Sequence, residues 1–129
     1  SADERKQAAL EYARMAHEYN RGGMTCILCS ICHLREVRRQ MRAIIGKVME
    51  VYLDCPVPVC ASRDRNGHYS KAFQGLYDSF VGVTEPYQIS DRTECVLHTD
   101  TASIEECSRV LLEATRAFLQ KGTANGDGA

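Results

Sequence analysis

The sequence has no excess of positive charge and no long apolar run. Its formal net charge is −1, whereas a protein that binds nucleic acid through its phosphates needs a basic surplus. No stretch reaches about 18 consecutive apolar residues, the length that spans a bilayer. The N-terminus begins as a charged helix and lacks the pattern of a secretory signal. We therefore expect one domain within these 129 residues, with no nucleic-acid partner and no membrane insertion.

The sequence is rich in cysteine. The chain has seven cysteines, an odd count, and several lie in apolar segments. Small secreted domains use even sets of cysteines as disulfide frameworks. This pattern favours reduced thiols and a cytoplasmic location.

A first helix is predicted at the N-terminus. Ser1 and Glu4 have the spacing of a capping box, and Gly22-Gly23 supplies a stop signal. Small and aromatic residues recur between them at helical spacing: Ala9, Tyr12, Ala13, Ala16 and Tyr19. We expect these five to share one face of the helix.

Two further helices are predicted later in the chain. Arg35–Ile45 has the composition of a basic helix, and Ser103 with Glu106 forms a second capping box. An apolar stripe continues from that box: Ile104, Cys107, Leu111, Ala114 and Phe118. Such a stripe is typical of a helix that packs against a core.

Three apolar runs between turn signals predict strands. They are Met24–Ser30, Lys47–Leu53 and Glu94–His98. Nearly continuous apolar runs are typical of parallel strands that are buried on both faces. Their alternation with helices predicts an α/β fold with a mainly parallel sheet.

The first of these runs carries a cysteine motif, Cys26-x-x-Cys29-x-x-Cys32-His33. Its end has the C-x-x-C-H form of haem attachment, and the triplet spacing is similar to that of an iron–sulfur run. On a strand, alternate side chains point to opposite faces, so cysteines three apart would not converge. The motif therefore fits small apolar thiols in a buried strand, with a metal or redox site as the alternative if the segment is a loop.

The most informative motifs lie between Asp54 and Tyr87. After Asp54-Cys55-Pro56 comes the pair Arg63-Asp64, then a polar segment, then Phe80-Val81-Gly82-Val83. This region resembles the adenylylsulfate kinase family, where the run reads D-x-P-x-x-V-C-x-x-R-D-x-x-G-x-Y-x-K-A, followed by F-x-G-[IV]-x-x-P-Y. Order and spacing agree over about thirty residues, which indicates common ancestry.

The resemblance continues on both sides and covers about residues 1–120. Five more segments are similar to family motifs: Ser1–Arg5, Gly22–Ile27, Ile31–Arg35, Val96–Asp100 and Ser103–Cys107. It implies a P-loop kinase-like, three-layer α/β/α domain over residues 1–120 with a lid at about 63–85. Residues 121–129 are expected to form a disordered tail.

A glycine-rich phosphate loop is absent from the sequence. No G-x-x-x-x-G-K-[ST] occurs, and the Gly46-Lys47 pair is followed by Val48. In kinases of this class that loop holds the nucleotide phosphates and Mg²⁺. We therefore expect these residues to lack the N-terminal strand-helix-strand portion of the family. Either they are the C-terminal part of a longer protein, or they are a remnant that has lost the phosphate chemistry.

The resemblance implies three groups of site residues. Nucleotide contacts fall on Arg63, Thr99 and Thr101. Substrate contacts fall on Arg5, Ile31, Cys32 and Phe80. The lid would present Gly67, Tyr69 and Lys71 to the phosphates. The ordinary alternatives are an exposed position at a helix end for Arg63, core packing for Phe80 and a solvated loop for the lid residues. No catalytic residue and no metal ligand is assigned.

Several positions depart from the family pattern. Ala8 replaces an asparagine, Leu10-Glu11 replaces an arginine pair, and Cys32-His33 replaces Ser-Pro. In the lid, residues 71–78 replace the family segment K-A-R-A-G-E-I-K, with the loss of two basic residues and a gain of apolar ones. These changes reduce the attraction for a sulfate–phosphate acceptor and leave the identity of the acceptor open.

The function implied is transfer of a phosphoryl group from ATP, with Mg²⁺, to the 3′-hydroxyl of adenylyl sulfate. The chain alone is expected to be inactive because it lacks the phosphate loop. The alternatives are a diverged kinase with another hydroxyl acceptor and a non-catalytic pseudokinase or regulatory module. A homodimer or a partner that supplies a strand could cover the exposed sheet edges.

Overall fold

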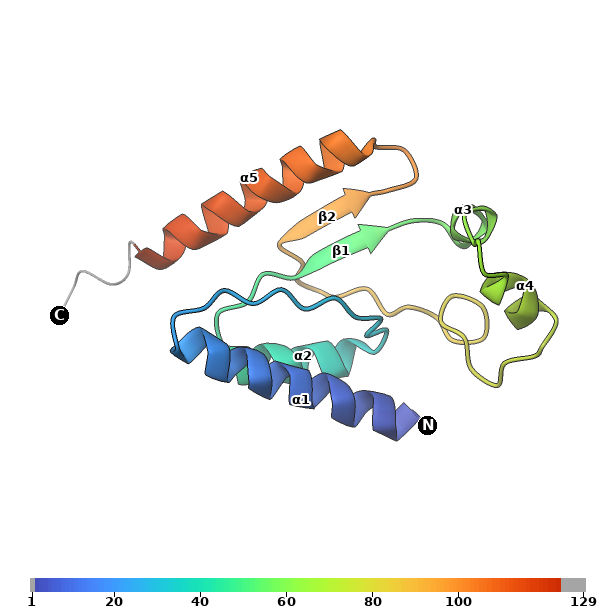
Figure 1. Ribbon diagram of the computed structural model, residues 1–129, viewed down its shortest axis with the longest axis horizontal. Helices are drawn as coiled ribbons and strands as arrows, with labels where there is room; N and C mark the ends of the chain where they lie inside the picture. The colour runs from blue at the N-terminus through green and yellow to red at the C-terminus, as the bar shows by residue number, and fades with distance from the viewer. Residues whose placement is uncertain (1, 124–129) are drawn as a thin grey trace. The chain divides into compact units, whose positions relative to one another are not determined.

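The structure is a computed structural model that describes residues 2–123. Its helices and strands, in order, are α1 (Ala2–Arg21), α2 (Arg35–Ile45), β1 (Val51–Asp54), α3 (Val57–Ser62), α4 (His68–Phe73), β2 (Cys95–His98) and α5 (Ile104–Thr123) (Figure 1). The described residues form two compact units. The first comprises residues 2–48 and 86–90, and the second comprises residues 49–85 and 91–123.

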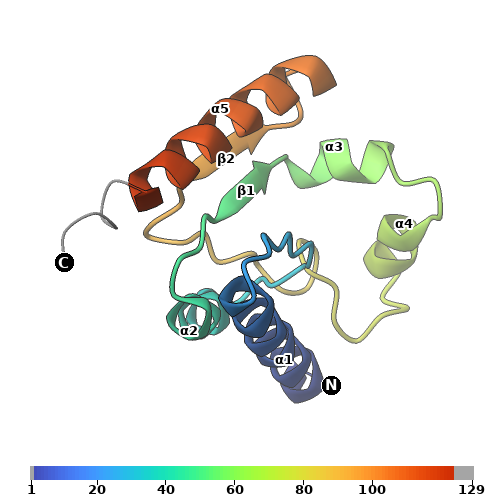
Figure 2. The ribbon, with the colours of Figure 1, turned by 60° about the vertical axis from the view of Figure 1, so that its left-hand side comes forward.

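The first unit is built on the side-by-side packing of α1 and α2 (Figures 1 and 2). Ala13 and Ala16 of α1 are buried with Ile45 of α2. One turn away along the interface, Leu10 packs with Val37. Small alanine side chains allow two helices to approach closely, so the core of this unit is a thin apolar seam.

The predicted stripe on α1 is confirmed only for its alanines. Ala13 and Ala16 are buried, whereas Tyr12 and Tyr19 are half-exposed. The helix ends as predicted at Gly22-Gly23. Gly23 has φ of +84°, a left-handed conformation that favours glycine, and the next amide bonds back to the Tyr19 carbonyl at 3.1 Å.

The predicted capping contact of Ser1 lies outside the described residues. Helix α2 has the predicted bounds, Arg35–Ile45. It begins without a side-chain cap and ends at Gly46, whose N–H donates to the Arg42 carbonyl at 3.0 Å.

The predicted strand at Met24–Ser30 is wrong. The segment is irregular, and the Ile27 side chain is 87% exposed. A strand requires a neighbouring strand for its backbone hydrogen bonds. Within residues 2–123, the paired strands are β1 and β2 alone, so this apolar run has no sheet to join.

The second unit contains a parallel pair of strands. The register joins Val51 to Cys95 and runs to Asp54 opposite His98. The strands predicted at Lys47–Leu53 and Glu94–His98 are confirmed as the shorter strands β1 and β2. Helix α5 packs on β2 (Figure 1), where Cys95 and Leu97 are buried.

The capping box at the start of α5 is confirmed. The Glu106 N–H donates to Ser103 Oγ at 3.1 Å, and the Ser103 N–H donates to Glu106 Oε2 at 2.9 Å. Most of the predicted stripe is half-buried on α5, but Ile104 is exposed. The helix continues to Thr123, three residues into the predicted tail, and residues 124–129 lie outside the described range.

No helix within residues 2–123 is long and apolar enough to cross a membrane.

Candidate functional site

The carboxyl ends of β1 and β2 form one edge of the sheet in the second unit. The Asp54 carbonyl ends β1 and accepts a hydrogen bond from the Thr99 N–H at 3.0 Å. The Asp54 carboxylate lies 3.1 Å from Nδ1 of His98, its partner in the register. In open α/β sheets, ligands bind beyond the carboxyl ends of parallel strands. This edge is therefore the candidate ligand site of the second unit.

Helix α3 brings an arginine to this edge. Pro58 fits the first turn of the helix, where no intrahelical N–H bond is required. The helix ends at Arg63, whose Nη1 donates to the Thr99 carbonyl at 2.9 Å. Thr101 lies exposed in the same turn, in which the Ala102 N–H bonds to the His98 carbonyl at 2.9 Å. The three predicted nucleotide residues therefore gather at one edge.

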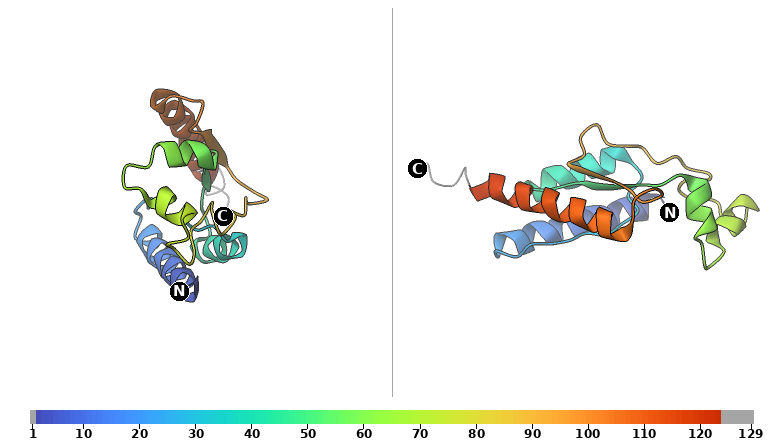
Figure 3. Two further views of the ribbon diagram at one scale, coloured as in Figure 1. Left: turned by 90° about the vertical axis from the view of Figure 1, so that its right-hand side faces the viewer. Right: turned by 90° about the horizontal axis from the view of Figure 1, so that it is seen from above.

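The lid segment follows α3 and contains a helix that sequence patterns did not predict (Figures 2 and 3). Asp64 organises its start, because its carboxylate accepts from the Tyr69 N–H at 2.7 Å and from the Asn66 N–H at 3.1 Å. The bond from Tyr69 is the main cause that lowers the pKa of Asp64. Gly67 precedes α4 with φ of +69°, which a side chain would disfavour.

The predicted lid residues have different environments. Tyr69 is half-buried, and Lys71 is exposed on the same short helix. Burial is the main cause that raises the pKa of Tyr69, and the nearby Cys60 thiol adds to it. Burial also raises the pKa of Cys60, followed by its contact with Cys55. Lys71 is thus an exposed charge of the predicted lid, while Tyr69 is half-buried.

Phe80 lies in an aromatic cluster. Its ring is 5.0 Å from Tyr69 in an edge-to-face arrangement and 5.7 Å from Tyr77 in a stacked one. The Tyr77 hydroxyl lies 2.8 Å from His68 Nδ1, which fixes that ring. One face of the Phe80 ring is therefore covered by Tyr77. The stacking of Phe80 on a substrate base stays a prediction.

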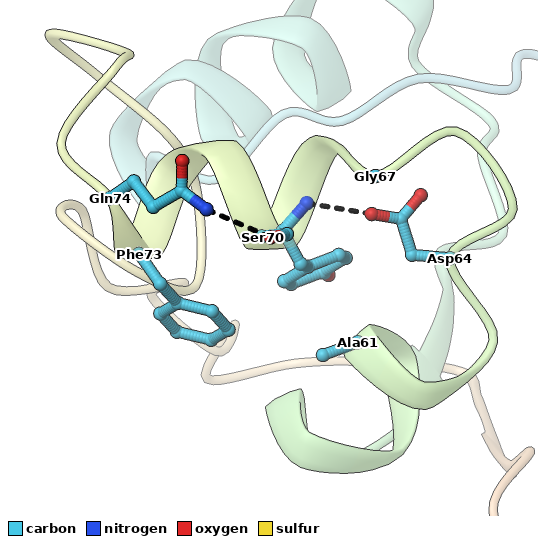
Figure 4. A pocket seen from close by; sticks show the side chains of 7 residues that line it. Ala61, Asp64, Gly67, Ser70, Phe73 and Gln74 are labelled. Carbon is cyan, nitrogen blue, oxygen red and sulfur yellow. Dashed lines mark hydrogen bonds between the residues drawn. The ribbon is translucent and has the colours of Figure 1, made fainter.

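An open hollow of about 370 Å³ lies between α3 and α4 (Figure 4). Its lining residues are Ala61, Asp64, Gly67, Tyr69, Ser70, Phe73 and Gln74. Figure 4 shows the Phe73 ring pointing towards Ala61, with the Asp64 carboxylate turned to the backbone of α4. The walls are largely apolar, and the carboxylate is already engaged.

The other predicted substrate residues belong to the first unit. Arg5 is exposed on α1, and the Ile31 side chain is 79% exposed in the irregular segment before α2. Cys32 is half-buried against the seam formed by Leu10 and Val37. Ile31 and Cys32 are thus neighbours on one loop, with the first directed to solvent.

The cysteine motif lies in the irregular segment before α2. Cys29 is exposed, and Cys26 and Cys32 are half-buried, all with free thiols. Among residues 2–123, no group of three His, Cys, Asp or Glu side chains is placed to hold a metal ion. The expected buried strand is also absent, so the three thiols are loop residues.

Arg38 of α2 is a buried, hydrogen-bonded residue that sequence reasoning did not single out. It is only 9% exposed. Its guanidinium donates to the carbonyls of Cys32 and Gln88 and to Ser90 Oγ, and it lies over the Tyr87 ring at 4.7 Å. The local sequence gave no signal, because Arg38 lies among other basic residues of an expected basic helix.

Comparison with known proteins agrees with this geometry. The family model described as adenylylsulphate kinase matches residues 1–98. An adenylyl-sulfate kinase from Clostridium kluyveri is 37% identical over 100 residues, which cover 77% of this chain and 50% of that protein. An adenylyl-sulfate kinase from Synechococcus sp. is 33% identical over 103 residues, or 80% of this chain and 59% of that protein.

A solved structure described as the crystal structure of APE1195 aligns with a TM-score of 0.77. It is 24% identical in sequence, and the alignment covers 92% of this chain and 69% of that one. This likeness confirms the predicted P-loop kinase-like α/β fold. The chain spans about half the length of the curated relatives it matches. Because the family model matches most of its residues, the chain belongs to the adenylylsulphate kinase family.

Proposed function

We propose that the protein transfers a phosphoryl group from ATP to the 3′-hydroxyl of adenylyl sulfate. The observation that carries this proposal is the bond from Arg63 to the Thr99 carbonyl at the carboxyl edge of the sheet. This contact supports the proposal because it joins two residues that the family pattern assigns to the nucleotide, at the edge where parallel sheets bind ligands. Family membership supports the reaction class.

The chain's own residues would bind and enclose the substrates. The planar guanidinium of Arg63 suits the face of an adenine base. Thr99 and Thr101 would border that base, and the exposed Lys71 would bring positive charge to the phosphates when the lid closes. Closure excludes water from the reacting phosphoryl group.

Mg²⁺ and the phosphate loop are not accounted for by these residues. The described residues offer no cluster of acidic or sulfur ligands for a metal ion, and the 129 residues contain no G-x-x-x-x-G-K-[ST]. We therefore assign no step to Mg²⁺. We further propose that residues 1–129 alone do not catalyse the transfer. The free thiols of all seven cysteines suit a reducing compartment such as the cytosol.

One observation favours a second candidate, a kinase for a different hydroxyl acceptor. In the lid, the Phe73 side chain is 60% exposed at a position where the family pattern has an arginine. An exposed apolar lid suits a less anionic acceptor than adenylyl sulfate.

The test compares the complete gene product with residues 1–129 alone. Each is incubated with ATP, Mg²⁺ and adenylyl sulfate, and the 3′-phosphorylated product is measured by mass spectrometry. We expect product from the complete protein and none from residues 1–129. ADP formation that requires another alcohol would support the second candidate. No product from any acceptor would contradict both and favour a non-catalytic module.

A further inference from the structure

A single buried side chain joins two distant segments of the first unit. Arg38 Nη1 donates to the Cys32 carbonyl at 2.5 Å, and Nη2 donates to the Gln88 carbonyl. Nε donates to Ser90 Oγ at 3.0 Å. The guanidinium therefore connects the loop 31–34 to the strap, which we define as residues 86–90.

Residues His33 and Arg35 form further hydrogen bonds to the strap. The Arg35 N–H donates to Gln88 Oε1 at 3.0 Å, and Arg35 Nε donates to the Ile89 carbonyl at 2.8 Å. The Gln88 N–H donates to the carbonyl of buried His33 at 3.0 Å. The strap has no helix or strand of its own, so these bonds determine where it lies.

Arginine is suited to this connection in a way that lysine is not. Its planar fork directs several N–H groups at fixed angles, whereas a lysine ammonium is a point charge on a flexible stem. The flat face also packs on Tyr87, at 4.7 Å from the ring centroid. The bond to the Cys32 carbonyl ties the guanidinium itself to the loop 31–34.

We propose that Arg38 is a positioning residue for the acceptor side of the reaction. It holds the loop 31–34 on the strap, so that Ile31 and Cys32 are presented to the acceptor in one conformation. The chain enters the strap at Pro86, directly after the predicted lid, so Arg38 also holds the residues that follow that segment. The kinetic part of this inference rests on the function proposed above.

The test uses the complete gene product and the variant Arg38→Lys. The matched control is Arg39→Lys, because Arg39 is the next residue of α2 and pairs at 3.9 Å with Glu36 on the exposed face. Backbone hydrogen exchange is followed by mass spectrometry in peptides that cover residues 31–34 and 86–90. Steady-state kinetics are measured separately against adenylyl sulfate and ATP.

We expect Arg38→Lys to speed exchange in both peptides by about tenfold, the effect of losing hydrogen bonds to a charged group. The KM for adenylyl sulfate should rise about tenfold, with kcat and the KM for ATP changed by less than about twofold. Arg39→Lys should behave as the unaltered protein. A purely structural role would instead lower the melting temperature and change both KM values alike, and that result would overturn the proposal.

Two further measurements cover an inactive protein and a variant that does not fold. If the unaltered protein has no activity, the proposed function fails, and the exchange experiment alone decides whether Arg38 anchors the loop to the strap. Unchanged exchange in both peptides overturns the proposal. If Arg38→Lys does not fold, Ser90→Ala removes one acceptor only, and we expect a smaller acceleration in the same peptides. No acceleration in that variant would likewise overturn it.

Discussion

Arg63 Nη1 donates a 2.9 Å hydrogen bond to the carbonyl oxygen of Thr99, and this bond closes the carboxyl edge of the sheet. Thr99 is itself fixed to the end of β1, because its N–H donates to the Asp54 carbonyl at 3.0 Å. The end of α3 and the turn after β2 are therefore joined by the Arg63 side chain.

Replacement of Arg63 should weaken nucleotide binding. Arg63→Ala removes a charged donor and a flat surface for a base, and we expect the Kd for ATP of the complete gene product to rise about tenfold. Arg63→Lys keeps the positive charge but not the planar group, so its Kd for ATP should lie between those of the unaltered protein and Arg63→Ala. Isothermal titration calorimetry measures both. The control Arg65→Ala alters an exposed arginine two residues away, and equal losses in Arg63→Ala and Arg65→Ala would refute the assignment.

Loss of the α5 capping box should destabilise the second unit. Ser103→Ala removes the acceptor of the Glu106 N–H and should lower the free energy of unfolding by about 1 kcal/mol. Urea denaturation followed by circular dichroism gives this value. Ser108→Ala is the matched control, because an exposed serine inside the same helix should be stabilised slightly by alanine. An unchanged midpoint for Ser103→Ala would show that the cap contributes nothing.

Asp64 should make the lid helix sensitive to acid. Its pKa is lowered in the folded protein, mainly by the bond from the Tyr69 N–H. The stabilisation is therefore present above the unfolded pKa of about 3.9 and is lost as the pH falls through the lower folded value. We expect Asp64→Asn to reduce the acid dependence of unfolding, measured as urea midpoints from about pH 5 downwards. The exposed Asp78 offers the control Asp78→Asn, and identical pH profiles for the two variants would contradict this prediction.

The cysteines should differ in their reactivity towards alkylation. Burial raises the pKa of both Cys60 and Cys95, which lowers their thiolate fraction at neutral pH. The exposed Cys29 should therefore react first with iodoacetamide, followed much later by Cys60 and Cys95. A time course of peptide masses tests the order. Cys60 reacting as fast as Cys29 in the folded protein would rule out its protected environment.

Local signals in the sequence predicted much of the secondary structure. Arg35–Ile45 and the box of Ser103 with Glu106 depend on residues within one or two turns, and both are present as predicted. Arg63 and Thr99 were predicted as nucleotide contacts from the family pattern, and that role stays a prediction. Their contact became visible only in the structure, because it joins residues 36 positions apart.

The errors concern features that depend on distant partners. Met24–Ser30 has the composition of a buried strand, but composition cannot show whether a neighbouring strand is available for its hydrogen bonds. Arg38 was missed for the same reason. Its partners Gln88 and Ser90 lie 50 and 52 residues away, so its burial leaves no local pattern.

The parallel pairing of β1 and β2 also has a consequence for the order of folding. The first pair in the register, Val51 with Cys95, closes a loop of 44 residues (95 − 51). Such a closure is entropically unfavourable until the strands meet, whereas helices form from neighbours within microseconds. We expect stopped-flow circular dichroism to record helical signal before the amides of Tyr52 and Leu53 become protected from exchange. The sheet edge that carries Asp54 and Thr99 would then be the last part of the unit to assemble and the first to open under mild denaturant.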